Sequence, residues 1–308
     1  MADDLQPSET VDAVAAADYA MRNWRFPTPG AIRIGSDAHK QMFCRQLLET
    51  HNPYKPAIID WPKLAPDALK RITSLPIWDI AVQTEGRAGI RAQTYADTVA
   101  DPLLHEALSM DAAEERRHKV VLSRLVEVYG IQLAPEPEYP APRHAEWAWM
   151  VTGYSECIDT FFSFGLFEAA KRTGYFPIEL VDTFEPVIQE ESRHILFYVN
   201  WIAWHRHQLP WWKRPWFRVK IMAVWAFLIY EHIGLARGFN SDGEAQDASF
   251  TMTGGKEMGV ELGVLDLLQI CLTENDRRMA GYDARLLRPT FVPFFARLAC
   301  RFGRKRKA

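Results

Sequence analysis

Two copies of the pattern Glu-x-x-His, each set in a long run of helical periodicity, constrain this chain more than any other feature. The copies are Glu115–His118 and Glu191–His194. Residues three apart lie on one face of a helix, one turn from each other. In both segments that face is otherwise apolar, so each carboxylate and imidazole is expected to point into a helical core. Burying a charged group in this way costs several kcal/mol unless it is paired or bound to a metal.

The chain is expected to be all-α, because helical periodicity dominates and no strand alternation is convincing. We divide it into three parts: an N-terminal helical extension at 1–74, a four-helix bundle at 75–208, and a C-terminal helical extension at 209–308 that carries a Trp-rich segment and a basic tail. Proline and glycine mark most of the junctions between the predicted helices.

The four bundle helices are predicted at about 76–99, 102–129, 144–172 and 177–208. Further helices are predicted at about 8–24, 37–50, 215–237, 256–273 and 290–301, with a polar loop at 241–255. Only the bundle carries residues with the spacing of a metal site, so the search for further ligands is confined to it.

Two further carboxylates are expected from the first and third bundle helices. Glu85 precedes Glu115 by 30 positions, which is about the distance a chain needs to run up one helix, turn and return to the same depth. Glu156 precedes Glu191 by 35 positions, whereas Glu168 precedes it by only 23. Equal depth in the bundle therefore favours Glu156, and Glu168 is the alternative.

Four carboxylates and two imidazoles form a donor set that suits a pair of divalent cations. The carboxylates neutralise much of the charge and can bridge two ions, and the imidazoles leave positions open for dioxygen. One Glu-x-x-His pair by itself is more often a chance surface feature, but two copies on apolar faces with matched carboxylates favour a metal site. The predicted ligands are Glu85, Glu115, His118, Glu156, Glu191 and His194.

Several neighbours are candidates to support these ligands. Asp111 and Asp159 lie one turn from a ligand and are expected to accept the free N–H of a ligand histidine. Glu114 and Glu190 point about 100° away from the ligand face, so we expect them to support the ligands or to pair with nearby arginines. Tyr198 is a candidate proton donor or radical carrier, although a buried tyrosine with one hydrogen bond is the favoured interpretation.

With this constellation, residues 76–208 resemble the ferritin-like di-iron carboxylate proteins, which include rubrerythrin, the demethoxyubiquinone hydroxylases and the acyl-carrier-protein desaturases. The resemblance implies a ferritin-like four-helix bundle that holds two iron ions (Fe²⁺/Fe³⁺), with manganese as the alternative metal, and O₂ as co-substrate. The N-oxygenating branch has an additional histidine where this chain has Val187, which argues against arylamine oxygenation.

The implied function is an O₂-dependent oxidoreductase, a hydroxylase (monooxygenase) or a desaturase, acting on a small hydrophobic organic substrate. Electrons are expected from an external ferredoxin or reductase, because the chain has no flavin, nicotinamide or iron–sulfur motif. One alternative is a rubrerythrin- or ferritin-like ferroxidase or peroxidase that handles metal or peroxide. Another is a non-enzymatic helical protein at a membrane surface. A homodimer is among the assemblies we allow for.

Composition restricts the partners and the cellular location that we expect for the chain. The formal net charge of −3 gives no signal for nucleic acid. Four scattered cysteines and an N-terminus without a secretion signal fit a cytoplasmic protein, and the absence of an apolar run of about 18 residues argues against a spanning helix. Residues 211–230 mix aromatic and basic side chains. We favour a core helix for this segment, with peripheral contact at a membrane surface as the alternative.

Overall fold

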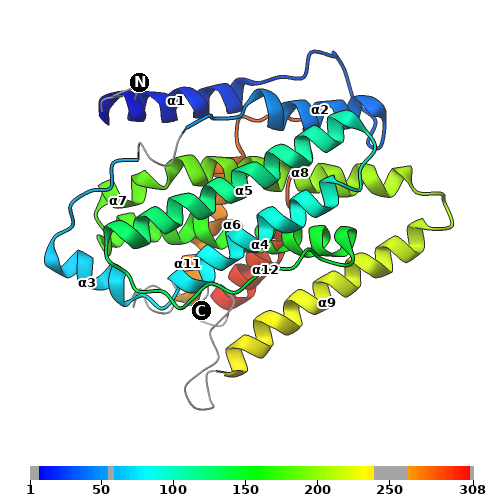
Figure 1. Ribbon diagram of the computed structural model, residues 1–308. Coiled ribbons are helices and arrows are strands. Elements are labelled where there is room, and N and C mark those ends of the chain that lie inside the picture. Colours follow the sequence, from blue (N-terminus) through cyan, green and yellow to red (C-terminus); the bar gives the residue numbers. More distant parts are fainter. Residues whose placement is uncertain (1–6, 55–58, 239–262, 306–308) are drawn as a thin grey trace.

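Four long helices run side by side through the centre of the molecule (Figure 1). The computed structural model describes residues 7–54, 59–238 and 263–305, and all regular secondary structure in these ranges is helical. The central helices are α4 (Trp78–Ala96), α5 (Pro102–Val128), α6 (Ala145–Thr173) and α8 (Glu185–Gln208). α4 packs along α5 and against α6, and α6 packs against α8. The expectation of an all-α protein is confirmed.

Local sequence explains where the central helices begin and end. The Asp101 side chain caps α5 by accepting a hydrogen bond of 3.0 Å from the Leu104 N–H, and Pro102 occupies the first turn, where a missing N–H costs nothing. α6 ends at Gly174, whose φ of 65° lies in the left-handed region that glycine adopts without strain.

The prediction of one continuous helix at 177–208 is wrong, because the structure has two helices in this range. A short helix, α7 (Ile178–Thr183), is separated from α8 at Phe184. Pro186 explains the break: proline lacks an N–H and its ring clashes with the carbonyl four residues earlier, so a helix begins at this point rather than continuing through it. For the same reason Pro66 opens a helix that was not predicted, α3 (Pro66–Ser74).

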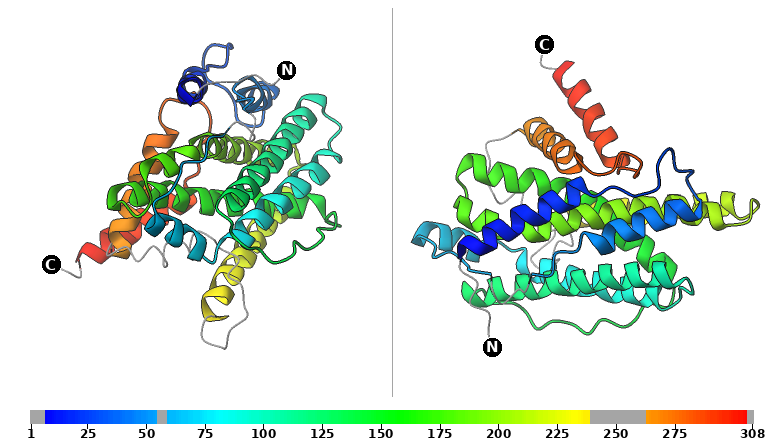
Figure 2. Two further views of the ribbon diagram at one scale, coloured as in Figure 1. Left: turned by 60° about the vertical axis from the view of Figure 1, so that its left-hand side comes forward. Right: turned by 90° about the horizontal axis from the view of Figure 1, so that it is seen from above.

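Five more helices surround the central four: α1 (Pro7–Asn23), α2 (Asp37–Glu49), α9 (Arg214–Gly238), α11 (Val264–Met279) and α12 (Phe291–Lys305). α2 packs against α5 and α8, and α11 packs along α6 (Figure 2). The predicted polar loop, the start of the predicted helix at 256–273 and the end of the basic tail lie outside the described residues.

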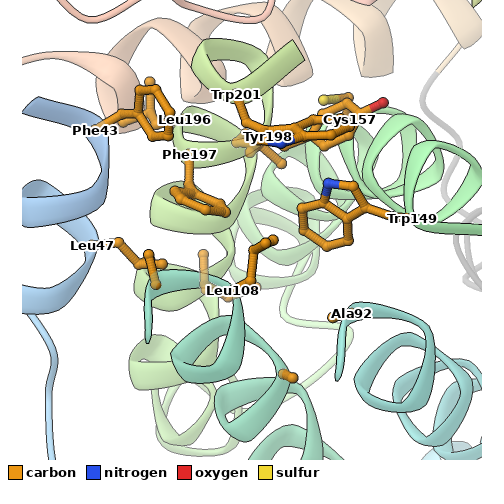
Figure 3. Packing of buried hydrophobic residues seen from close by; sticks show 14 of the residues in the cluster. Phe43, Leu47, Ala92, Leu108, Trp149, Cys157, Leu196, Phe197, Tyr198 and Trp201 are labelled. Carbon is orange, nitrogen blue, oxygen red and sulfur yellow. The ribbon is translucent and has the colours of Figure 1, made fainter. Parts of the chain in front are cut away.

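One apolar core joins α2 to the central helices (Figure 3). Phe43 of α2 meets Phe197 of α8 with ring centroids 5.5 Å apart, and Trp149 of α6 meets Trp201 of α8 at 5.8 Å. Contact between α6 and α8 is close at Gly153, where an added Cβ would lie 2.1 Å from the ring of Tyr198. The N-terminal helices therefore share the core of the central four.

Within the described residues, none of the helices has both the length and the apolarity that a membrane span requires.

Candidate metal centre

α5 and α8 bring the two Glu-x-x-His pairs together in the middle of the protein. Ligand atoms from Glu115, His118, Glu191 and His194 all lie within 4.8 Å of one another. Nδ1 of His118 is 3.2 Å from a Glu191 oxygen, and Nδ1 of His194 is 2.8 Å from a Glu115 oxygen. The two imidazole rings have centroids 5.5 Å apart and no solvent exposure. Each imidazole therefore faces the carboxylate of the opposite helix.

The other two predicted carboxylates adjoin this cluster. A Glu85 oxygen on α4 lies 3.7 Å from Nδ1 of His118. Glu156 on α6 lines the same cavity as Glu85 and Glu115 and is close enough to Glu115 for their charges to interact. Glu168 instead forms an ion pair of 2.6 Å with Arg172 and is not part of this cavity. The structure thus clusters Glu115, His118, Glu191 and His194, and the four predicted glutamate ligands line one cavity that excludes Glu168.

The hydrogen bonds that orient the imidazoles differ from the expectation. Nε2 of His118 bonds to Glu190 at 2.9 Å, and Nε2 of His194 bonds to Glu114 at 2.7 Å. Asp111 is buried but neither of its oxygens has a hydrogen-bond partner, so it does not accept an imidazole N–H as predicted. A side chain one turn from a ligand on the same helix points in parallel with it, whereas the far nitrogen of each ring faces the opposite helix.

Glu114 and Glu190 are in turn held by arginines in a reciprocal exchange. Two hydrogen bonds, of 2.9 and 3.0 Å, run from Arg193 to Glu114, and Arg117 binds Glu190. Both helices carry the same local sequence, Glu-Glu-x-Arg-His, and the arginine and histidine of each copy bind the first glutamate of the other. This repeat is a sequence signal that the two motifs have matched surroundings, but it does not specify which helix supplies each partner.

The end of α2 and the segment after it supply partners for Arg193, Glu114 and Glu190 that were not predicted from the sequence. Arg193 is fully buried and donates to Thr50 Oγ1 at 3.0 Å and to the Leu47 carbonyl. His51 bonds to Glu114 at 2.5 Å, and the Tyr54 hydroxyl donates to Glu190 at 3.2 Å. These residues have no helical spacing that relates them to the two motifs, so only the packing of α2 onto α5 and α8 brings them here.

Two other candidates have local partners. The Tyr198 hydroxyl donates to the Met150 carbonyl at 3.1 Å inside an aromatic cluster, which agrees with the interpretation of a buried tyrosine with one hydrogen bond. Asp159 lines the cavity and accepts a hydrogen bond of 2.9 Å from the Ser155 hydroxyl on its own helix. The predicted role of Asp159 as partner of an imidazole is not fulfilled, because Glu114 and Glu190 hold those positions.

Buried polar atoms without a hydrogen-bond partner concentrate at this centre. They include Nδ1 of both imidazoles, one oxygen of Glu115 and both oxygens of Glu156 and of Asp111. Proteins rarely leave such atoms unpaired unless an ion or water completes them. The atoms converge on one another and combine carboxylate oxygen with imidazole nitrogen, so the residues present fit a pair of divalent cations.

Burial and neighbouring charges both shift the pKa values of the clustered carboxyl and imidazole groups. Burial raises the pKa of Glu115 and Glu156 well above the usual range, and that of Asp111 to about 6. Burial alone would lower the pKa of His118 and His194, but the surrounding carboxylates raise both values well above the usual range. Without a metal the cluster retains protons, and a bound cation would displace them.

A cavity of about 270 Å³ lies beside the four carboxylates. Its lining changes character along α6, from Thr152 and Ser155 near one end, past Glu156, to Phe167 and Ala170 at the other. Aromatic and aliphatic residues complete the second end: Leu75, Trp78, Phe176, Leu180 and Phe184. Arginines complete the first end, with Arg87 and Arg91 from α4. The cavity therefore has an apolar end, a central row of carboxylates and a polar end.

Comparison of the chain with family models, with curated proteins and with solved structures gave no match. The functional argument therefore rests on the chemistry of this centre.

Proposed function

We propose that the chain is a ferritin-like di-iron oxidoreductase that uses O₂ to hydroxylate or desaturate a small hydrophobic organic substrate. One observation carries the proposal: the exchange between α5 and α8 turns Nδ1 of both imidazoles, neither of which forms a hydrogen bond, toward the carboxylates of Glu191 and Glu115 beside an apolar chamber. Two ions would supply dioxygen activation when bound. Their ligands would be Glu85, Glu115, His118, Glu156, Glu191 and His194. Manganese would suit the same donors.

Charged neighbours orient the two ligand histidines. Glu190 and Glu114 accept the Nε2 protons of the two imidazoles, which fixes each ring with Nδ1 toward the centre. Burial tends to raise the pKa of Glu114, but Arg193 and His194 lower it well below the usual range. The carboxylate therefore stays ionised and keeps its imidazole in place. Arg117 binds Glu190 in the same way.

The cavity supports oxidation of an organic molecule rather than simple handling of metal. Its apolar end, with Phe167 and Phe184, would exclude water and accept a hydrocarbon portion. The reacting carbon would then lie beside the carboxylate row. A ferroxidase needs only a route for ions and has no use for such a chamber. No other residues within the described ranges suggest a redox cofactor, so electrons would come from a ferredoxin or a reductase.

Metal analysis combined with oxygen uptake tests the proposal. The metal-free protein is loaded anaerobically with Fe(II), desalted, and analysed for iron; about two ions per chain are expected. After chemical or ferredoxin-dependent reduction, air is admitted in the presence of candidate apolar substrates. Mass spectrometry should detect a product that has gained one oxygen atom or lost two hydrogen atoms.

A matched pair of histidine variants gives the control. His118→Ala/His194→Ala should lose bound iron and oxygen uptake, whereas His144→Ala/His207→Ala removes two exposed imidazoles and should change neither. Full iron occupancy in the first double variant would show that the ligand assignment is wrong. Accumulation of many irons per chain in a soluble shell would instead indicate a storage protein.

A further inference from the structure

Exposed apolar side chains are frequent along α9 up to Tyr230 and in the turn before this helix. Trp211 is 76% exposed, Trp216 is 73% exposed and Tyr230 is 75% exposed. The other exposed apolar residues of this segment are Trp212, Val219, Met222, Phe227 and Ile229. The opposite side is also apolar, with Phe217, Val224 and Leu228 buried against the protein. A helix that is apolar on all sides is normally covered on all sides, so the exposed face of α9 calls for a partner.

α12 has an exposed aromatic face of the same kind. Phe294 and Phe302 are each 58% exposed. Phe291, Phe295 and Leu298 share that face and are also exposed, while Ala296 and Cys300 on the other side are buried. The spacing of three, four and seven residues places the phenylalanines in one stripe. Exposed Arg297 and Arg301 flank this stripe.

The two faces belong to one side of the molecule. Trp225 of α9 contacts Phe291 of α12 with ring centroids 4.1 Å apart. In Figure 1 α9 (yellow) extends below the central helices, and the view from above in Figure 2 shows α12 (red) behind them. We call the exposed apolar residues of 211–230 and 291–302 the α9–α12 surface. Its extent exceeds the scattered exposed apolar residues that ordinary soluble proteins tolerate.

Charge identifies the kind of partner. Residues 211–230 and 291–308 together contain ten Lys and Arg residues and no Asp or Glu, whereas the whole chain has a formal net charge of −3. A second copy of the chain docked on this surface would bring like charges together, which is unfavourable. Tryptophan and basic side chains are instead the residues enriched where proteins meet the headgroups of a bilayer, and anionic lipid attracts the cations.

We propose that the α9–α12 surface docks onto an anionic lipid bilayer. The aromatic side chains lie at headgroup depth, and Lys213, Arg218 and Arg301 contact anionic lipid. Leu228 and Glu231 of α9 also line the cavity beside the carboxylates, so the docking helix contributes to the wall of that cavity. This proposal rests on the surface alone and does not require the proposed oxidation.

Vesicle co-sedimentation of the full chain tests the docking. Vesicles of phosphatidylcholine with phosphatidylglycerol should bind the protein at low salt, and vesicles of phosphatidylcholine alone should bind it much less. Salt at about 0.5 M should weaken the binding because it screens the basic residues. Trp212→Ser/Trp216→Ser and Phe294→Ser/Phe302→Ser should each lower the partition coefficient by at least roughly tenfold.

A control variant separates this surface from general stickiness. Tyr19→Ser/Val120→Ser removes two exposed apolar side chains from α1 and α5, elsewhere on the protein, and should bind vesicles like the parent. Circular dichroism of every variant checks that the fold is retained. Absence of binding to anionic vesicles at low salt would overturn the proposal. So would equal binding by the aromatic variants, or a dimer in light scattering that the same substitutions abolish while no vesicle binding is seen.

Discussion

Replacing Glu156 by leucine is expected to stabilise the metal-free protein and to destabilise the metal-loaded one. Both carboxylate oxygens of Glu156 are buried, and neither has a hydrogen-bond partner. A residue kept for structure would lower stability under both conditions when removed. A residue kept for metal binding lowers the stability of the metal-free protein, and only metal binding offsets this loss, as is common at functional sites.

The size of both effects follows from the burial. Replacing a buried, unpaired polar group by an apolar one of similar volume recovers about 1–3 kcal/mol of desolvation free energy. Leucine and glutamate have similar helix propensities, so the backbone contributes little. At about 2 °C per kcal/mol, the melting temperature of metal-free Glu156→Leu should exceed that of the parent by about 2–6 °C. Metal at a thousandfold excess over its Kd should raise the parent by about 4 kcal/mol, or roughly 8 °C.

The assay is thermal unfolding of both proteins, first with a chelator and then with Fe(II) under anaerobic conditions. The order of melting temperatures should reverse between the two conditions, and iron per chain should fall in the variant. Glu168→Leu is the matched control on the same helix. It removes only a surface ion pair with Arg172, worth about 0.3–0.5 kcal/mol, and should shift neither curve by more than about 1 °C.

The reasoning is refuted if Glu156→Leu keeps two irons per chain, or if it lowers the melting temperature in chelator. The first result would remove Glu156 from the ligand set. The second would mean that its carboxyl group has a structural role in the metal-free protein. Loss of iron in Glu168→Leu, with iron retained in Glu156→Leu, would show that the register of α6 was misassigned.

Three further predictions test other parts of the structure. Gly153→Ala places a Cβ 2.1 Å from the ring of Tyr198. Because this overpacking outweighs the gain in helix propensity, the free energy of unfolding measured in urea should fall by about 1–2 kcal/mol. A hydrogen bond from His205 is the main cause that lowers the pKa of Glu146 from 4.5 to about 2. This group therefore stabilises the fold above pH 4.5 and loses its effect as the pH falls toward 2. Glu146→Gln should cost about 1 kcal/mol at pH 7, discounted for its partial exposure, and almost nothing at pH 2 in urea titrations. Arg193→Met leaves a buried carboxylate uncompensated and should cost about 3–5 kcal/mol in unfolding free energy, with weaker metal binding in a chelator competition.

Local patterns predicted the central helices well. Asp101 and Pro102 form a start signal that depends only on neighbouring residues, and α5 begins where that signal lies. The periodicity that placed Glu115 and Glu191 on apolar faces is equally local, and in the structure Glu115 is buried and Glu191 is partly buried. The break at Phe184 could have been predicted from Pro186 by the same kind of reasoning.

The partners of the imidazoles could not be predicted in this way. Glu114 lies beside a ligand in the sequence, yet it binds His194 on another helix because of how α5 and α8 are rotated about their axes. That rotation is set by tertiary packing and leaves no periodic trace. His51 and Tyr54 are further cases, since they reach the centre from the segment after α2 only when α2 is packed in place.

The reciprocal exchange between α5 and α8 also sets an order of events during protein synthesis. Glu114 and His118 leave the ribosome well before Glu190 and Arg193, because Glu190 follows Glu114 by 76 positions. Until α8 emerges, Glu114 has only His51 and Arg117 as partners and lacks Arg193 and His194, so burying it at that stage is costly. A nascent chain that has reached only α6 therefore holds an incomplete centre, which is completed only late in synthesis when α8 supplies Glu190, Arg193 and His194.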